Sequence, residues 1–236
     1  MKVLRLVIKA CFVLLFAVSS FGAEAQRSPA SVAVIRTSAV PRATLKKRIV
    51  FFGNSLTAGY GVAAQRNLPS LIAQKIDSAG LSYTVVNAGV SGETTAGGLR
   101  RIGSVLRQPV DVFVLELGAN DAFRMVPVAD IRRNLQGIVD AVKRRNPKAQ
   151  IVIAGMQIPG VFGPGYVSEF QGVFREVAAK NRARLIPFLL ENVGGIPELN
   201  QPDGIHPTAA GYRIVAGTVW KTLGPLLQPA DAKGIQ

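Results

Sequence analysis

The sequence predicts an α/β fold in which a five-stranded parallel sheet is covered by helices on both faces. Short apolar segments rich in β-branched residues alternate with longer segments whose apolar residues recur every three or four positions. The short segments are almost continuously apolar, as is typical of strands buried on both faces. The longer segments are long enough to cross over between parallel strands, which a short hairpin cannot do.

The first strand is expected at residues 49–52, an Ile-Val-Phe-Phe run that stops at a glycine. A helix is expected at 68–76, because its apolar residues share one face and Pro69 suits a first helical turn. Residues 83–87, which read Tyr-Thr-Val-Val-Asn, form the second expected strand.

The next helix is expected at 95–107 and ends before Pro109, since the residue preceding a proline disfavours helical geometry. A third strand follows at 112–117, where five of six residues are apolar. The longest helix covers 128–145, with its apolar residues at helical spacing, and ends at an Asn-Pro pair.

The fourth strand is expected at 150–155 and the fifth at 184–188, on either side of a helix at 167–181. A closing helix is expected at 207–223, because Pro207 is well suited to the first position of a helix.

A serine follows the first strand within a glycine-rich turn that reads Gly-Asn-Ser-Leu-Thr-Ala-Gly. Ligand sites of open α/β sheets lie at the carboxyl ends of the strands, so Ser55 is a candidate nucleophile. Such a serine is also a common turn or cap residue. Catalytic partner residues elsewhere in the chain are therefore needed to distinguish the two roles. The segment lacks the G-x-S-x-G elbow of α/β-hydrolases, because no glycine stands two places after Ser55.

The segment Asp-Gly-Ile-His-Pro near the other end of the chain supplies these partners. His206 is the only histidine of the chain and follows Asp203 by three residues. On a short turn this spacing can bring the carboxylate to one imidazole nitrogen and leave the other for Ser55, as an activated serine requires.

Two further strand ends complete a set of four blocks, with Gly89 in Asn-Ala-Gly-Val-Ser-Gly and Asn120 in Gly-Ala-Asn-Asp. With the Ser55 and His206 blocks, in this order, the chain from about residue 48 to 227 resembles the SGNH or GDSL-type hydrolases. It is most similar to the bacterial branch that acts as thioesterase, arylesterase and lysophospholipase.

The resemblance implies a three-layer, flavodoxin-like SGNH hydrolase fold and a serine esterase acting through an acyl-enzyme. It implies that Ser55 is the nucleophile, that His206 is the general base and then acid, and that Asp203 orients His206. The oxyanion hole would consist of the backbone N–H groups of Ser55 and Gly89 with the Asn120 amide. The alternatives are that Gly89 is a turn glycine and Asn120 a helix cap.

One residue departs from the family pattern, which usually has aspartate where this chain has Asn54. Asparagine is nearly isosteric with aspartate but neutral, and it adds donors. Because Asp203 already supplies a carboxylate for His206, we expect Asn54 to tune the site without abolishing it.

The loop at residues 156–166 is apolar and glycine-rich, and it follows a strand end. We expect Met156, Ile158 and Phe162 to form an acyl pocket, favouring an acyl chain or aryl group. The alternative is a packed surface loop without a role in binding.

The chain divides into four parts. Residues 1–25 combine a basic start, a short apolar run and an Ala-Glu-Ala site, which predicts a cleavable signal peptide and a periplasmic or secreted protein. The alternative is an uncleaved anchor. Residues 26–47 read as a flexible lead-in, 48–227 as the hydrolase domain and 228–236 as a C-terminal tail. Cys11 is the only cysteine, so a mature chain could form no disulfide.

The formal charge is +14, and +12 remains without residues 1–25. The basic residues are scattered without interleaved aromatic side chains, which argues against nucleic-acid binding and leaves loose attraction to anionic lipid as the expected partner contact. With one histidine and dispersed carboxylates we expect no metal and no cofactor. We expect a monomer that takes a small acyl ester or thioester.

Two other functions remain open at this point. A carbohydrate O-acetylesterase could use the same scaffold and the same three catalytic residues. A non-catalytic envelope-binding protein is the other alternative, and Asn54 is the one feature that favours it.

Overall fold

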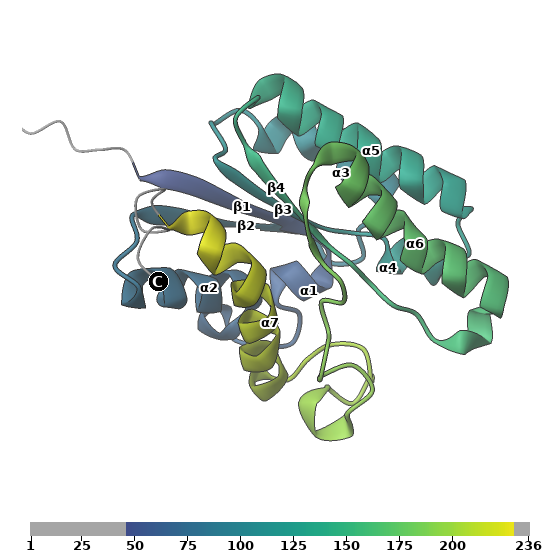
Figure 1. The fold of residues 1–236 in the computed structure, drawn as a ribbon. Coiled ribbons are helices and arrows are strands. Elements are labelled where there is room, and N and C mark those ends of the chain that lie inside the picture. The colour runs from purple at the N-terminus through teal and green to yellow at the C-terminus, as the bar shows by residue number, and fades with distance from the viewer. Residues whose placement is uncertain (1–45, 229–236) are drawn as a thin grey trace, which may run out of the picture. The chain divides into compact units, whose positions relative to one another are not determined.

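The structure is a computed structural model that describes residues 46–228. The expected signal peptide, nearly all of the expected lead-in and the tail from residue 229 lie outside the described residues. The rest contains a five-stranded sheet in the order β2-β1-β3-β4-β5, and every neighbouring pair is parallel (Figure 1). The strands are β1 (Lys47–Gly53), β2 (Tyr83–Gly89), β3 (Val112–Glu116), β4 (Gln150–Ala154) and β5 (Arg184–Ile186).

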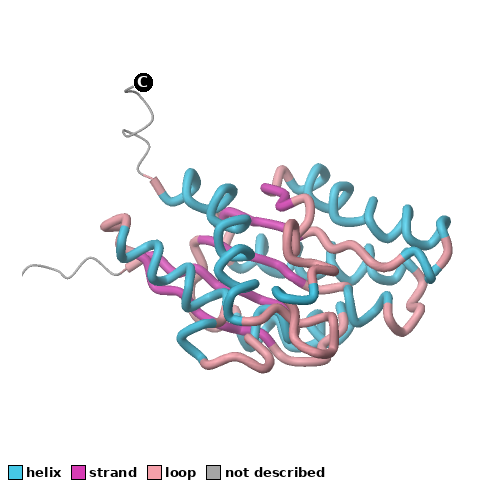
Figure 2. Tube along the Cα trace, turned by 90° about the horizontal axis from the view of Figure 1, so that it is seen from below, coloured by secondary structure: helices cyan, strands magenta, loops and turns pink. Residues whose placement is uncertain are grey.

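Helices cover both faces of this sheet, so the predicted α/β fold class is confirmed. The α-helices are α1 (Ser55–Ala58), α2 (Leu68–Ser78), α3 (Thr95–Val105), α4 (Ala119–Ala122), α5 (Val128–Arg145), α6 (Pro164–Asn181) and α7 (Ala209–Leu227). Three 3₁₀ turns are η1 (Ala64–Arg66), η2 (Gly160–Phe162) and η3 (Pro197–Leu199). Helices α2 and α7 pack together below the sheet in Figure 1, and α3, α5 and α6 pack side by side above it. Figure 2 shows the strands side by side between these helices.

The core follows from this three-layer arrangement. Residues 49–53 of β1 and all of β3 are buried, because both strands lie at the centre of the sheet and face helices on both sides. Phe52 and Phe113 pack with ring centroids 5.5 Å apart. Full burial of one such side chain stabilises the folded state by about 1.5–3 kcal/mol.

Two helices begin at other residues than expected, and α2, α3 and α7 end at Ser78, Val105 and Leu227 instead of residues 76, 107 and 223. Helix α6 begins at Pro164, so the last residues of the expected irregular loop are helical. Helix α7 begins at Ala209, because Thr208 is the N-cap and its side chain accepts a hydrogen bond from the Gly211 N–H at 3.2 Å. Pro207 instead forms a bridge with Asn200.

Strand register brings the chain segments of the site to one edge of the sheet. Gly53 at the end of β1 is level with Gly89 of β2 on one side and Glu116 of β3 on the other. The carboxyl ends of all three strands therefore open at the same place, where ligand sites of this sheet type lie. None of the helices within residues 46–228 is both long enough and apolar enough to span a bilayer.

Candidate active site

Ser55 is the first residue of α1 and is held by a tight strand-to-helix turn. Asn54 caps the helix, and its Oδ1 accepts a hydrogen bond from the Leu56 N–H at 2.9 Å. A Cβ at Gly53 would overlap the Thr57 hydroxyl and Glu116, so only glycine allows β1 to end this close to its neighbours. Within residues 46–228 the Ser55 N–H has no acceptor, as expected for the first turn of a helix.

His206 lies between Ser55 and Asp203. Its Nε2 is 2.8 Å from Ser55 Oγ, and its Nδ1 is 2.7 Å from Asp203 Oδ2. The other carboxylate oxygen, Asp203 Oδ1, accepts hydrogen bonds from the N–H groups of Ile205 at 2.9 Å and His206 at 3.0 Å. The three-residue spacing works because this short turn folds the chain back onto its own carboxylate.

The electrostatics of this turn set the tautomer of the imidazole. The hydrogen bond from the His206 N–H, aided by the imidazole and the Ile205 N–H, lowers the pKa of Asp203 to about 2. Asp203 is therefore ionised at neutral pH and holds the proton of neutral His206 on Nδ1. Nε2 then has a lone pair for the Ser55 hydroxyl, which makes the arrangement a base-activated nucleophile.

Tyr60 covers one face of this imidazole, with ring centroids 4.6 Å apart. The Gln201 side-chain amide donates to the carbonyl of Tyr60 at 2.8 Å and to that of Pro207 at 3.0 Å. This amide ties the histidine loop to the loop after Ser55. We did not predict Tyr60 or Gln201 from the sequence, because no motif connects two loops 141 residues apart.

Asn120 is held at the edge of the cavity by a hydrogen bond from its Nδ2 to the Glu93 carbonyl at 3.1 Å. Glu93 itself forms an ion pair with Arg101, whose guanidinium lies 4.0 Å from the centre of the Phe52 ring. One Nδ2 hydrogen of Asn120 is left to donate to a ligand.

Behind Asn120, Asp121 accepts hydrogen bonds from the Thr95 N–H at 2.8 Å and the Thr95 hydroxyl at 2.6 Å. Burial raises the pKa of Asp121. These bonds attach α4 to the start of α3, so the segment that carries Asn120 is anchored.

Gly89 does not lie where the oxyanion hole requires it. Its N–H donates to Asn87 Oδ1 at 3.0 Å, and it does not line the cavity. A Cβ here would overlap the backbone of Ala58, so this glycine allows close packing of α1 against β2. Gly92 lines the cavity instead, at φ 77°, and its N–H has no partner among the described residues. The expectation that Gly89 donates into the cavity is therefore wrong, and Gly92 is the glycine of this segment that lies beside the cavity.

A cavity of about 670 Å³ opens beside Ser55, Asn120 and His206. Met156 and Ile158 line it, as expected, but Phe162 does not. Phe162 lies in η2 and meets the cavity only through Phe123, with ring centroids 6.0 Å apart. The apolar wall that sequence reasoning missed comes from other loops and consists of Phe123, Phe188, Leu190 and Ile205.

Among residues 46–228, His, Asp and Glu form no cluster of three that could hold a metal ion.

Comparisons with known proteins agree with this geometry. Residues 51–214 match the model of the GDSL-like lipase/acylhydrolase family. The chain is 37% identical to esterase TesA of Pseudomonas aeruginosa over 180 residues, which are 76% of this chain and 89% of the relative. It is 33% identical to thioesterase 1/protease 1/lysophospholipase L1 of Escherichia coli K12 over 187 residues, 79% of this chain and 88% of that one.

A solved structure of TesA superimposes with a TM-score of 0.73 at 35% identity, covering 77% of this chain and 100% of that one. The order and spacing of the four blocks, the parallel sheet and these similarities lead to one conclusion: the chain belongs to the GDSL-like lipase/acylhydrolase family, the SGNH hydrolases.

Proposed function

We propose that the protein hydrolyses carboxylic ester or thioester bonds of small acyl substrates through an acyl-enzyme on Ser55. The observation that carries this proposal is the hydrogen-bonded series from Ser55 Oγ to His206 Nε2 and from His206 Nδ1 to Asp203, at 2.8 and 2.7 Å. The esterase, thioesterase and lysophospholipase names of the relatives support the same chemistry.

His206 Nε2 accepts the proton of Ser55 as Oγ attacks the acyl carbonyl. The negative charge that develops on the carbonyl oxygen is stabilised by the N–H groups of Ser55 and Gly92 and by the Asn120 amide. The intermediate then expels the alcohol or thiol, which takes the proton from His206. Water, activated by the same imidazole, releases the acid in a second cycle. All of these groups come from one chain, so a monomer suffices.

The cavity supports an acyl or aryl group as the part of the substrate that is recognised. Its volume of about 670 Å³ is in the range of small-molecule sites, and its wall is largely apolar. The relatives named arylesterase and lysophospholipase suggest an aromatic or fatty acyl ester.

A fluorophosphonate probe and a series of p-nitrophenyl esters and acyl-CoA thioesters test this proposal. We expect labelling of the wild type, none of Ser55→Ala, and an optimum of turnover at short or medium acyl length. Asp203→Asn is the matched control, since it keeps Ser55 but disturbs the histidine tautomer. A wild-type protein that neither reacts with the probe nor hydrolyses any ester would refute the proposal.

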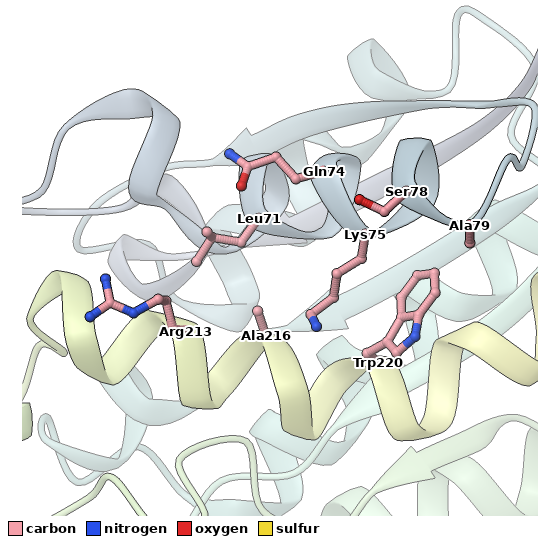
Figure 3. Close-up of a pocket in the computed structure, with 8 residues that line it drawn as sticks. All are labelled: Leu71, Gln74, Lys75, Ser78, Ala79, Arg213, Ala216 and Trp220. Atoms are coloured by element: carbon pink, nitrogen blue, oxygen red, sulfur yellow. The ribbon is translucent and has the colours of Figure 1, made fainter.

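We also propose that a basic groove between α2 and α7 makes contact with anionic lipid surfaces (Figure 3). Lys75 reaches from α2 toward Trp220 of α7. Arg213 lies on the same helix, at the other end of the groove from Trp220. Neither cation forms an ion pair within residues 46–228, and an indole beside cations suits the interface of a bilayer.

Sedimentation with phosphatidylglycerol vesicles, compared with phosphatidylcholine vesicles, tests this contact. We expect binding to the anionic vesicles only, and a clear loss in the Lys75→Ala/Arg213→Ala variant. The charge-matched control is Arg107→Ala/Arg145→Ala, a pair at the groove beside α3 and α5. Equal losses in the two variants would show that net charge alone is responsible and would contradict a role for the groove.

We further propose that the protein is exported, which rests on the basic, apolar and Ala-Glu-Ala pattern of residues 1–25. Cell fractionation with N-terminal sequencing of the mature protein tests it. A periplasmic or secreted chain beginning at residue 26 is expected, and an uncleaved cytoplasmic chain would contradict it.

A further inference from the structure

A buried carboxyl group lies under the turn that carries the nucleophile. Glu116 is the last residue of β3, is only 1% exposed and stands opposite Gly53 in the strand register. It belongs to neither the Ser55–His206–Asp203 series nor the wall of the cavity. Burying an ionisable group costs folding free energy, so a buried carboxyl group that takes no part in the chemistry needs another explanation.

The contacts of Glu116 lie on both sides of Ser55. Its Oε2 accepts a hydrogen bond from the Asn54 N–H at 3.1 Å, and another from the Thr57 hydroxyl at 2.9 Å. One carboxylate oxygen thus joins the residue before the nucleophile to the residue two places after it. The missing Cβ of Gly53 leaves the space in which this oxygen sits.

The other oxygen, Oε1, is buried and has no hydrogen-bond partner among the described residues. A protonated acid would need an acceptor for its hydroxyl, whereas an ionised carboxylate uses its charge to strengthen the bonds it accepts. The Asn54 N–H and the Thr57 hydroxyl both donate to Oε2, and the N–H cannot accept a proton in return, so these contacts suit the ionised form.

Few charged or titratable groups face this carboxyl. Tyr212 of α7 donates to the Leu56 carbonyl at 3.0 Å, so it ties the same turn, and burial together with the charge of Glu116 raises its pKa. Arg101 of α3 reaches the Gly53 carbonyl at 3.5 Å but is paired with Glu93. The groups bonded directly to Glu116, the Asn54 N–H and the Thr57 hydroxyl, are uncharged.

We propose that Glu116 is a positioning residue whose ionised carboxylate fixes the turn from Asn54 to Thr57, and with it the N–H and Oγ of Ser55. Both groups must be held closely, because Oγ attacks the substrate while the N–H of the same residue binds the oxyanion. The proposal rests on the proposed ester hydrolysis and extends it to the residue that maintains the geometry of the nucleophile.

A pH effect on catalysis follows from this role. Burial raises the pKa of Glu116 to about 7, against 4.5 for an ordinary glutamic acid, despite the hydrogen bonds that lower it. As the pH falls through neutrality the carboxylate therefore becomes protonated and holds the turn less firmly. Protonation of Glu116 should therefore contribute to the loss of activity on the acidic side.

The test is steady-state kinetics of Glu116→Gln and Thr57→Val on a p-nitrophenyl ester that the wild type hydrolyses. Glutamine keeps the shape and an acceptor oxygen but removes the charge. We expect kcat to fall about 10–100-fold with KM within twofold, because a misplaced nucleophile affects the chemical step more than binding. The acidic limb of log kcat/KM should be less steep in Glu116→Gln than in the wild type, because the contribution of Glu116 is lost.

Thr57→Val removes one donor without changing the shape, and we expect a smaller fall in kcat. Glu116→Gln weakens the hydrogen bond that Thr57 donates and Thr57→Val removes it, so the losses in kcat should be clearly less than additive in the double variant. Thr218→Val in α7, another buried threonine, is the matched control and should leave kcat unchanged. Thermal unfolding monitors whether each variant is folded at the assay temperature.

Unchanged kcat and an unchanged slope in Glu116→Gln would overturn the proposal, and so would fully additive losses in the double variant. If Glu116→Gln does not fold, Thr57→Val decides: a kcat equal to that of the Thr218 control would contradict the role. These outcomes differ from failure of the proposed function, in which the wild type itself would hydrolyse no ester.

Discussion

Glu116→Gln should gain stability relative to the wild type as the pH rises from about 5 to about 8, while it is less active. Glu116 is fully buried, and desolvation raises its pKa from 4.5 in the unfolded chain to about 7 in the folded protein. A group whose pKa is raised on folding contributes stability that is present below pH 4.5 and is lost as the pH rises through 7. With about 1.4 kcal/mol per pKa unit, the loss between pH 5 and pH 8 is about 2.5 kcal/mol.

Urea unfolding followed by circular dichroism at pH 5 and pH 8 measures this effect. Other groups also titrate, so the informative quantity is the difference in unfolding free energy between wild type and Glu116→Gln at each pH. This difference should shift by about 2.5 kcal/mol in favour of the variant at pH 8. Glu198→Gln, at an exposed position, is the matched control and should show almost no shift.

A difference between wild type and Glu116→Gln that is the same at both pH values would refute the reasoning. It would mean that Glu116 has similar pKa values in the folded and unfolded protein, and so that desolvation does not dominate its surroundings. A stabilised but less active variant at pH 8 would instead be a case in which a functional site reduces stability.

Three further predictions concern the site itself. Ser55→Ala and His206→Ala should each lower kcat by several orders of magnitude, and the double variant should be hardly worse, because the groups act as a unit; clearly additive losses in kcat would contradict this. Asn54→Asp should change kcat/KM by less than about tenfold, since either side chain can accept the Leu56 N–H, while the acidic limb of the pH–rate profile moves upward; a gain of several hundredfold would show that charge matters more than shape. Phe123→Ala should shift the preferred p-nitrophenyl ester toward longer acyl chains, and Phe162→Ala should shift it less, because Phe123 lines the cavity and Phe162 does not; equal shifts would return Phe162 to the wall.

The sequence alone was sufficient for the sheet, because strands buried on both faces and amphipathic crossover helices leave strong periodic signals. The helix at 128–145 was predicted with its bounds, since its apolar face and the Asn-Pro stop agree, but α7, with 19 residues, is longer. The sequence also identified Ser55, Asp203 and His206 as candidate catalytic residues, since their chemistry depends on a local turn and on strand ends. The structure brings these three residues together.

The N-cap role of Asn54 was not predicted from the sequence and comes from the structure. The four-residue helices α1 and α4 were not predicted, because one turn is too short to show a helical period.

Only the tertiary structure decided which glycine faces the cavity, because Gly89 and Gly92 differ in their surroundings and not in their residue type. It also decided the apolar wall, where Phe123 and Phe188 come from separate loops and Phe162 is turned toward Phe123. The role of Glu116 is of the same kind, since in the sequence it is one polar residue at the end of an apolar strand. Parallel register between β1 and β3 places its carboxylate under Asn54 and Thr57, 62 and 59 residues away in the chain. Contacts over such separations depend on how strands align and on the space a missing Cβ leaves, and neither is encoded in any local pattern of residues.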